Sequence, residues 1–196
     1  MSLIIAKVNR KERTQSLYSD GISVFNDEIV HNRMKKINHF THKNTAVSFG
    51  GTGASYFLTY VMDNFEKFFT EYVNENKPTG KQTEYYRKNL PIIFNRMADE
   101  YVSEMNISDD DDELKCSNGY IVVIDGEIYR VSKYGDERFR CSYKDGFDAL
   151  ACGVGEESAN CLMDVDIPIE RVFEIISKHY ATVNNTVFKD ENLCYF

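Results

Sequence analysis

The sequence has no tryptophan, only three prolines among 196 residues, and no long hydrophobic run. A membrane-spanning helix needs about 18 to 20 consecutive apolar residues, whereas the longest apolar stretches here, such as 121–124, are a few residues long. Three prolines and 11 glycines are also too few for a low-complexity linker. With 42% hydrophobic and 28% charged residues, the composition predicts a globular chain and not a membrane, fibrous or disordered protein.

Positive charge is in deficit. Lysine and arginine number 23 against 31 aspartates and glutamates, for a net charge of −8. An acidic surface repels phosphate backbones and anionic lipid. We therefore expect no nucleic-acid partner and no membrane partner.

The five cysteines are odd in number and include no C-x-x-C pair, which disfavours a disulfide framework or a zinc ribbon. The first residues lack the apolar stretch of a signal peptide, so we expect a cytoplasmic, reduced protein with its cysteines in the core. His39 and His42 lie near a polar turn without a metal-ligand set, and the acidic run 108–113 lacks the spacing of a calcium loop. No metal is expected, and no spacing selects a Cys–His dyad, which stays an open alternative.

Residue patterns predict short strands in the first 50 residues and again after residue 119. Alternating or β-branched segments bounded by turn residues such as Asp20-Gly21 and Asp125-Gly126 carry this prediction. The predicted strands are 3–8, 15–19, 22–25, 28–30, 34–40, 45–49, 120–124, 127–131, 147–152 and a last one within 185–196.

Apolar residues at three- and four-residue spacing predict helices in two places. The predicted helices are about 53–74, about 83–104, 157–163 and 168–183. Pro91 is expected to split or kink the second of them. Strands, two helices, strands and two helices follow one another, so we expect one domain over 1–196, with two stacked antiparallel sheets between two helix layers.

The glycine-rich segment 50–53 follows a predicted strand and opens a predicted helix. Backbone N–H groups bind anions in this context, but the segment lacks the lysine of a P-loop and the third glycine of a dinucleotide site. It is therefore interpreted either as an oxyanion hole or as a close-packed turn.

Four segments, taken together, form a recognisable series. Ser2 stands directly before a strand, Asp20 ends the next strand, Lys36 follows 16 residues later, and the Gly-Gly-Thr segment 50–52 closes the following strand. This series resembles the proteasome β-subunit family and, more closely, its bacterial HslV branch of N-terminal nucleophile hydrolases. The stretch 148–155 resembles that family's strand and glycine-rich turn before its third helix.

The resemblance implies a four-layer αββα sandwich and a peptidase. Ser2 would be the nucleophile once Met1 is removed, Asp20 and Lys36 would be the active-site carboxylate and lysine, and Gly50 would take the oxyanion-hole position. Such a mechanism requires no metal and no organic cofactor.

The chemistry of these residue types agrees with that assignment. A serine hydroxyl is a weak nucleophile until a base takes its proton, and an α-amine with a pKa of about 7.7 to 8.0 is such a base near neutral pH. A lysine ammonium at Lys36 would lower the pKa of both groups, and Asp20 would pair with it. The alternative interpretation of Asp20 and Lys36 is a structural cross-strand ion pair.

Two departures from the family pattern support a rival function. Val154 stands where many relatives carry serine, and the only candidates for a late polar pair near 178–185 are Asn184 and Asn185. The rival is a non-catalytic, ring-building or regulatory subunit, and a third hypothesis is an amidase of the same fold acting on a small amide. By resemblance, the partners would be further copies in a homo-oligomeric ring, a peptide or unfolded protein substrate, and an ATP-dependent unfoldase.

Overall fold

The computed structural model describes residues 2–21, 23–25, 28–31, 36–106, 117–143 and 145–194. Several sequence predictions lie partly or wholly outside these residues. They concern Ile22, the start of the predicted strand 34–40, the acidic run 108–113 and Cys116.

Two antiparallel sheets form the centre of the protein. The four-stranded sheet has the order β10-β1-β2-β11 and the five-stranded sheet the order β5-β6-β7-β8-β9, while β3 pairs with β4 separately. The strands are β1 Leu3–Asn9, β2 Thr14–Asp20, β3 Ser23–Phe25, β4 Glu28–His31, β5 Ile37–His42, β6 Thr45–Thr52, β7 Asn118–Ile124, β8 Glu127–Lys133, β9 Arg140–Tyr143, β10 Ala149–Gly153 and β11 Val187–Leu193. The helices are α1 Ser55–Glu75, α2 Gln82–Met105, α4 Glu156–Asp164 and α5 Ile169–Ser177.

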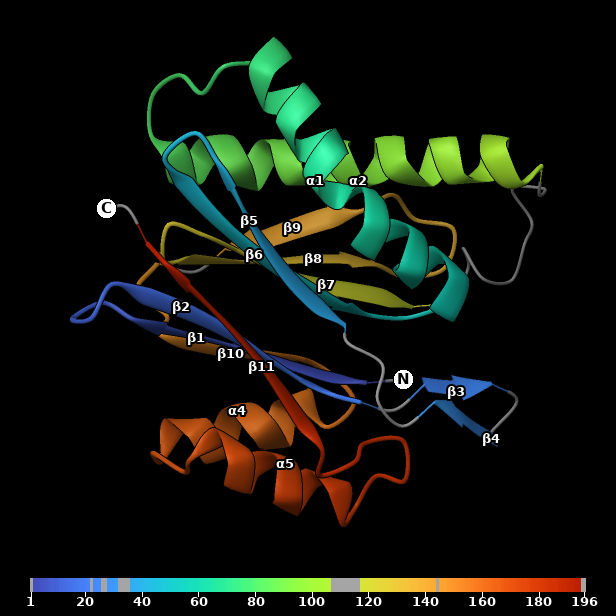
Figure 1. Cartoon of the computed structure of the whole chain (residues 1–196), viewed down its shortest axis with the longest axis vertical. Helices are drawn as coiled ribbons and strands as arrows, with labels where there is room; N and C mark the ends of the chain where they lie inside the picture. The colour runs from blue at the N-terminus through green and yellow to red at the C-terminus, as the bar shows by residue number, and fades with distance from the viewer. Residues whose placement is uncertain are drawn as a thin grey trace.

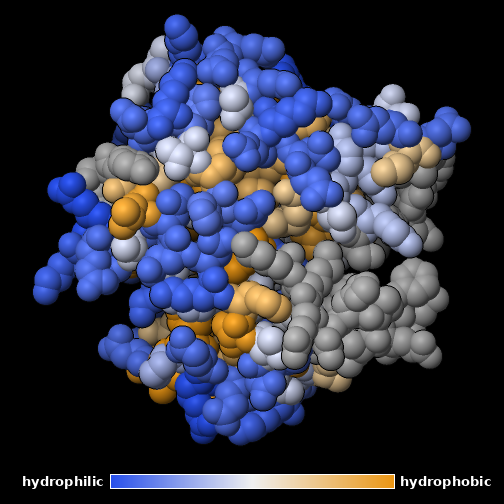
Figure 2. Space-filling view, in the orientation of Figure 1, coloured by the Kyte–Doolittle hydropathy of each residue, from blue (hydrophilic) through white to orange (hydrophobic). Residues whose placement is uncertain are grey.

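The two sheets stack face to face between two pairs of helices (Figure 1). Helices α1 and α2 cover the five-stranded sheet, and α4 and α5 cover the four-stranded sheet. This arrangement confirms the predicted four-layer αββα sandwich. Hydrophilic residues dominate the face shown in Figure 2, where hydrophobic residues show in separate small patches. Among the described residues, no helix combines the length and apolarity needed to cross a bilayer.

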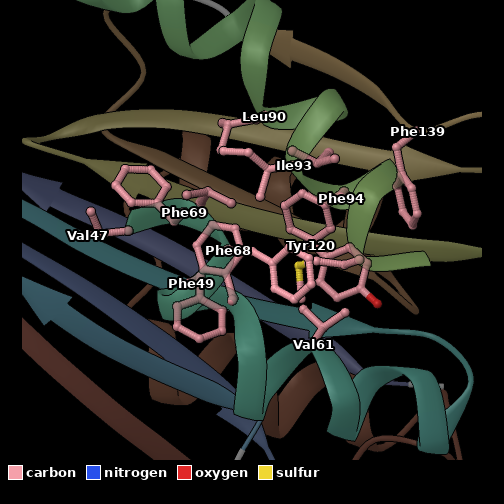
Figure 3. Close-up of a cluster of buried hydrophobic side chains, with 14 of the residues drawn as sticks. Val47, Phe49, Val61, Phe68, Phe69, Leu90, Ile93, Phe94, Tyr120 and Phe139 are labelled. Carbon is pink, nitrogen blue, oxygen red and sulfur yellow. The ribbon is translucent and has the colours of Figure 1, made fainter. Parts of the chain in front are cut away.

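Apolar side chains fill each of the three spaces between the layers. One cluster lies between α1, α2 and the five-stranded sheet, and its rings include Phe49, Phe69 and Phe94 (Figure 3). The Phe94 and Tyr120 ring centroids are 4.7 Å apart. A second cluster joins β1 to α5, and a third, with Leu17, lies between the sheets. The aromatic residues therefore act mainly as core, as large buried rings usually do.

The predicted end of the strand at 49 was wrong, because β6 continues through Thr52. Gly51 lets the strand pass close to a ring: a Cβ at Gly51 would lie 2.3 Å from Tyr120 Cδ1. These glycines therefore serve close packing within the strand. Helix α1 begins at Ser55 after Ala54 at its N-cap, so Gly50 does not lie at a helix N-terminus.

Two other predictions about elements need correction, and one strand was missed. Helix α2 is not split, because it runs from Gln82 to Met105 with Pro91 inside it; Pro91 has no N–H to donate to the carbonyl of Arg87. Helix α5 ends at Ser177 and not at 183, because the chain closes in tighter turns that include a bond from the His179 N–H to the Ile176 carbonyl. Strand β9 was not predicted, since its four residues are only partly buried.

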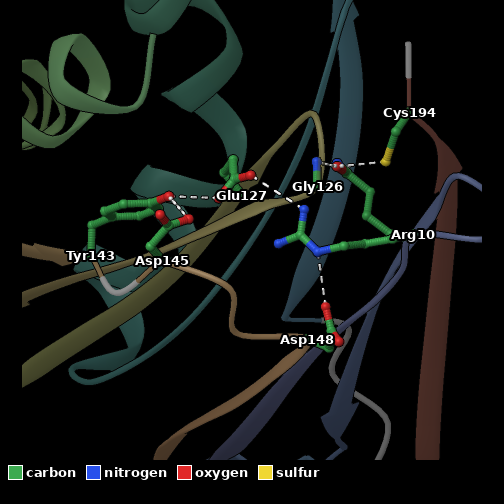
Figure 4. A network of polar contacts seen from close by, with 8 residues as sticks. Arg10, Gly126, Glu127, Tyr143, Asp145, Asp148 and Cys194 are labelled. Carbon is green, nitrogen blue, oxygen red and sulfur yellow. Dashed lines mark hydrogen bonds and ion pairs between the residues drawn. The ribbon is translucent and has the colours of Figure 1, made fainter. Parts of the chain in front are cut away.

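A buried glutamine links the two sheets. The Gln15 side chain on β2 is 0% exposed, and its amide donates to Ser48 Oγ at 2.8 Å and to the Val123 carbonyl at 3.2 Å. Its oxygen accepts from the Gly126 N–H at 3.1 Å. Figure 4 shows this end of the sandwich, where Arg10 also bridges Glu127 and Asp148.

Replacing Gln15 with methionine should lower the free energy of unfolding by about 1 to 3 kcal/mol, because buried partners lose their hydrogen bonds while the side-chain volume is nearly kept. Urea unfolding followed by circular dichroism measures this. Gln82→Met, at an exposed position on α2, is the control and should stay within about 0.5 kcal/mol of the parent. Equal stability of both variants would contradict the role of the buried amide.

Candidate active site

The ends of four strands bring the candidate residues together. Ser2 precedes β1, Asp20 ends β2, Lys36 precedes β5 and Thr52 ends β6. Strands β1 and β2 are antiparallel neighbours, with Ile4 opposite Ser19, so the start of one strand lies beside the end of the other.

Ser2, Asp20 and Lys36 form one buried cluster. They are 4%, 0% and 1% exposed. Lys36 Nζ donates a hydrogen bond to Ser2 Oγ and lies 3.5 Å from Asp20 Oδ1. The same Asp20 oxygen accepts the Leu3 N–H at 3.1 Å. Asp20 thus contacts both the lysine and the strand that carries the serine.

The surroundings of Lys36 lower the pKa of its ammonium. Burial lowers the pKa of the Lys36 ammonium, and the Asp20 carboxylate opposes this by Coulomb attraction and a hydrogen bond. A cation that donates to a hydroxyl oxygen favours the hydroxyl's deprotonated form. Since Lys36 occupies a lone pair of Ser2 Oγ, the Ser2 hydroxyl proton remains free to move to a base.

The backbone of Ser2 is held on both sides. Its N–H donates to Thr52 Oγ1 at 3.1 Å, and its carbonyl accepts the Val154 N–H at 2.9 Å. Gly153, with φ of 105°, allows this approach, because a Cβ there would lie 1.9 Å from the Ser2 carbonyl oxygen. Val154 therefore contacts Ser2 through its backbone, whatever its side chain.

Gly50 lies beside the lysine backbone within the five-stranded sheet. It pairs with Ile37, and the neighbouring Gly51 N–H donates to the Lys36 carbonyl at 3.2 Å. A Cβ at Gly50 would lie 2.9 Å from that same carbonyl oxygen. Gly50 is therefore close to the Ser2 cluster. An N–H group at Gly50 that donates to an anion would belong to a strand, whereas the sequence predicted the start of a helix.

Sequence reasoning missed two contributors to this site. The first is Thr52, whose hydroxyl contacts Ser2; the only signal was its place in the Gly-Gly-Thr segment. The second is an ion pair between Arg130 and Glu156, whose charged atoms lie 2.8 Å apart. The Glu156 carboxylate also accepts a hydrogen bond from the Gly153 N–H at 2.9 Å. This pair holds the turn against Ser2, and a cavity of about 230 Å³ adjoins it, lined by Thr52 and Gly153 among others.

The two buried cysteines of the described chain, Cys152 and Cys194, are unsuited to act as nucleophiles. Burial raises the pKa of the Cys152 thiol to about 12 and of the Cys194 thiol to about 11, which makes both poor nucleophiles at neutral pH. Cys161 is exposed, contrary to the expectation of a core cysteine. His39 Nδ1 lies 2.5 Å from Asp190 Oδ1. Within the described parts of the chain, no group of three or more His, Cys, Asp or Glu residues could hold a metal ion.

Solved structures similar to this protein point to one fold. No family model and no curated protein sequence matches the chain. Eukaryotic HslV from Trypanosoma brucei matches with a TM-score of 0.63 at 14% identity, over 96% of this chain and 98% of that chain. The BPH protein of Thiobacillus denitrificans, in complex with epoxomicin, matches with a TM-score of 0.63 at 12% identity over 98% of each chain.

A third similar structure is the helical assembly of the Anbu complex from Pseudomonas aeruginosa. It matches with a TM-score of 0.62 at 12% identity, over 98% of this chain and 81% of that chain. The protein has a proteasome-like fold. At these identities the likeness concerns the fold alone, so the case for an activity depends on the cluster around Ser2.

Lys36→Met should lower the free energy of unfolding by about 3 to 5 kcal/mol, because it leaves the Asp20 carboxylate buried without its cation. In the double variant Lys36→Met with Asp20→Asn, the loss should fall to about 1 to 2 kcal/mol, since the amide keeps an acceptor for the Leu3 N–H and carries no charge.

Chemical denaturation of both variants measures the difference. Lys88→Met is the control, because Lys88 pairs with Glu84 at 3.0 Å on the exposed face of α2 and should change stability by about 0.5 kcal/mol or less. A double variant as unstable as Lys36→Met alone would show that the buried charge is not the cause.

Proposed function

We propose that this protein is an N-terminal nucleophile peptidase in which Ser2, made the first residue by removal of Met1, attacks peptide bonds. The observation that carries the proposal is the hydrogen bond from Lys36 Nζ to Ser2 Oγ, in a buried cluster with Asp20. A serine exposed on the surface would not be held by a buried lysine in this way. The proteasome-like fold, which this protein shares with HslV, is consistent with peptide hydrolysis.

The proposed reaction begins with proton transfer. The α-amine of Ser2 takes the hydroxyl proton, directly or through a water, as Oγ bonds to the carbonyl carbon of the substrate. Lys36 favours the negative charge on Oγ, and Asp20 holds Lys36. The Gly50 N–H is the proposed donor to the oxyanion that develops on the substrate.

The intermediate then collapses in two stages. The C–N bond breaks as the ammonium of Ser2 returns its proton to the leaving amine, which leaves an ester on Oγ. Water next attacks the ester carbonyl, with the Ser2 amine again as base, and the acid product departs with Oγ reprotonated. No group outside this chain, the substrate and water enters the balance.

Other parts of the proposal concern the whole protein. We infer that residues 1–196 form a single proteasome-like domain in a cytoplasmic homo-oligomer, as a ring, with peptides or unfolded proteins as substrates and an ATP-dependent unfoldase as a candidate partner. The helical assembly of the similar Anbu structure supports self-association.

The rival function is a non-catalytic proteasome-like subunit, which Val154 favours because its side chain cannot relay a proton.

Purified protein should have lost Met1 by intact-mass measurement and should cleave fluorogenic peptides, and Ser2→Ala should abolish cleavage because the nucleophile is gone. Thermal unfolding should show that Ser2→Ala remains folded. Ser142→Ala, which removes an exposed serine on β9, is the control and should keep full activity.

The outcomes separate the hypotheses. Retention of Met1, or peptide cleavage by Ser2→Ala, would contradict the proposed mechanism. Loss of Met1 without cleavage of peptides or small amides supports the non-catalytic subunit, and turnover of small amides alone supports the amidase.

A further inference from the structure

The hydrogen bond described for the Ser2 nitrogen goes to the side chain of Thr52. The Ser2 nitrogen donates to Thr52 Oγ1 at 3.1 Å, and both residues are buried, at 4% and 7% exposed. The resemblance to proteasome-like peptidases assigned no role to this hydroxyl. Its partner is the nitrogen that the proposed mechanism uses as the base.

We propose that Thr52 is the positioning residue for the Ser2 α-amine and stabilises the ammonium that forms when this amine takes the hydroxyl proton. The inference rests on the proposed function, because only removal of Met1 turns the Ser2 nitrogen into an amine. It adds a residue to the proposed site and explains how the site works with Val154 in the glycine-rich turn.

The need for an acceptor follows from the charges around the amine. A buried ammonium without a hydrogen-bond acceptor is costly, and Lys36, which donates to Ser2 Oγ, adds a second positive charge close by. Val154 offers Ser2 a backbone N–H and no side-chain acceptor. Thr52 Oγ1 can accept an N–H from the ammonium at the point where this charge develops.

Packing fixes the direction of the Thr52 hydroxyl. The Thr52 methyl carbon, Cγ2, points at two glycines: a Cβ would lie 3.6 Å from it at Gly119 and 3.1 Å at Gly153. Gly119 is also the partner of Thr52 in the β6–β7 ladder. In threonine a single torsion angle, χ1, sets the directions of both the methyl and the hydroxyl. With the methyl packed against Gly119 and Gly153, Oγ1 is therefore directed toward the Ser2 nitrogen.

This geometry suggests two matched variants. Thr52→Val keeps the branched shape and loses the hydroxyl, whereas Thr52→Ser keeps the hydroxyl and loses the methyl. If Thr52 acted only through packing, valine would replace it well and serine poorly. If the hydroxyl supports the amine, serine should rescue and valine should not.

Activity gives the first readout. Thr52→Val should lower kcat by roughly ten- to a hundredfold, as expected for one lost hydrogen bond to a charged group, with KM nearly unchanged. Thr52→Ser should retain most of kcat. The acid limb of the kcat/KM profile should move to lower pH in Thr52→Val, because loss of an acceptor lowers the pKa of the amine.

The charged groups that share this surrounding are Lys36, Asp20 and, across the adjoining cavity, the Arg130–Glu156 pair. None of them is altered by either variant. A change of packing alone would lower the plateau of the pH profile without moving its acid limb, so the profile separates the two roles.

The second readout does not depend on turnover. Protein that starts at Ser2, released from a removable N-terminal fusion, carries the amine whether or not cells remove Met1. Nitrogen-15 NMR of a labelled Ser2 amine should give a lower pKa in Thr52→Val than in the parent or in Thr52→Ser, with thermal unfolding as the check on folding.

Equal amine pKa values in all three proteins overturn the role of Thr52, even if the parent is an active peptidase. A lower pKa in Thr52→Val without peptide cleavage by the parent supports the contact and rejects the proposed function. The two failures are therefore distinguishable.

Discussion

A buried lysine is the constraint on which the candidate site depends. Lys36 is 1% exposed, and a cation in such a position is tolerated only with close partners. Its partners, Asp20 and Ser2, come from the end of one strand and the start of another. The cluster forms only when β1, β2 and β5 hold their observed positions. The chemistry of Ser2 therefore requires the same placement of these strands as the fold does.

The two sheets are joined by polar contacts at both ends and by apolar contacts between them. Strand β2 shows this directly: Asp20 meets Lys36 at one end, Gln15 reaches Ser48 at the other, and Leu17 lies in the apolar cluster between the sheets. Polar contacts depend on direction and apolar ones do not. The ends therefore set how the sheets are aligned, while the middle supplies most of the burial.

Most of the elements could be predicted from the sequence because their signals are local. Hairpin turns such as Asp125-Gly126 and the apolar face of α1 depend on neighbours a few residues apart. The errors arose where tertiary contacts outweigh local preference. Gly50 and Gly51 continue β6 because Tyr120 needs the space beside Gly51, and Pro91 stays inside α2, where Leu90 and Ile93 next to it are buried in the core.

By itself, the sequence determined the order of most of the strands and of the described helices, the four-layer arrangement that follows from it, and the types of residue that could carry acyl-transfer chemistry. Only the tertiary structure decided that Thr52 contacts the nitrogen of Ser2, 50 residues away, and that Val154 acts on Ser2 through its backbone. The physical reason is register: a one-residue shift of a strand turns each side chain to the opposite face, and no local pattern records which residues of distant strands then meet.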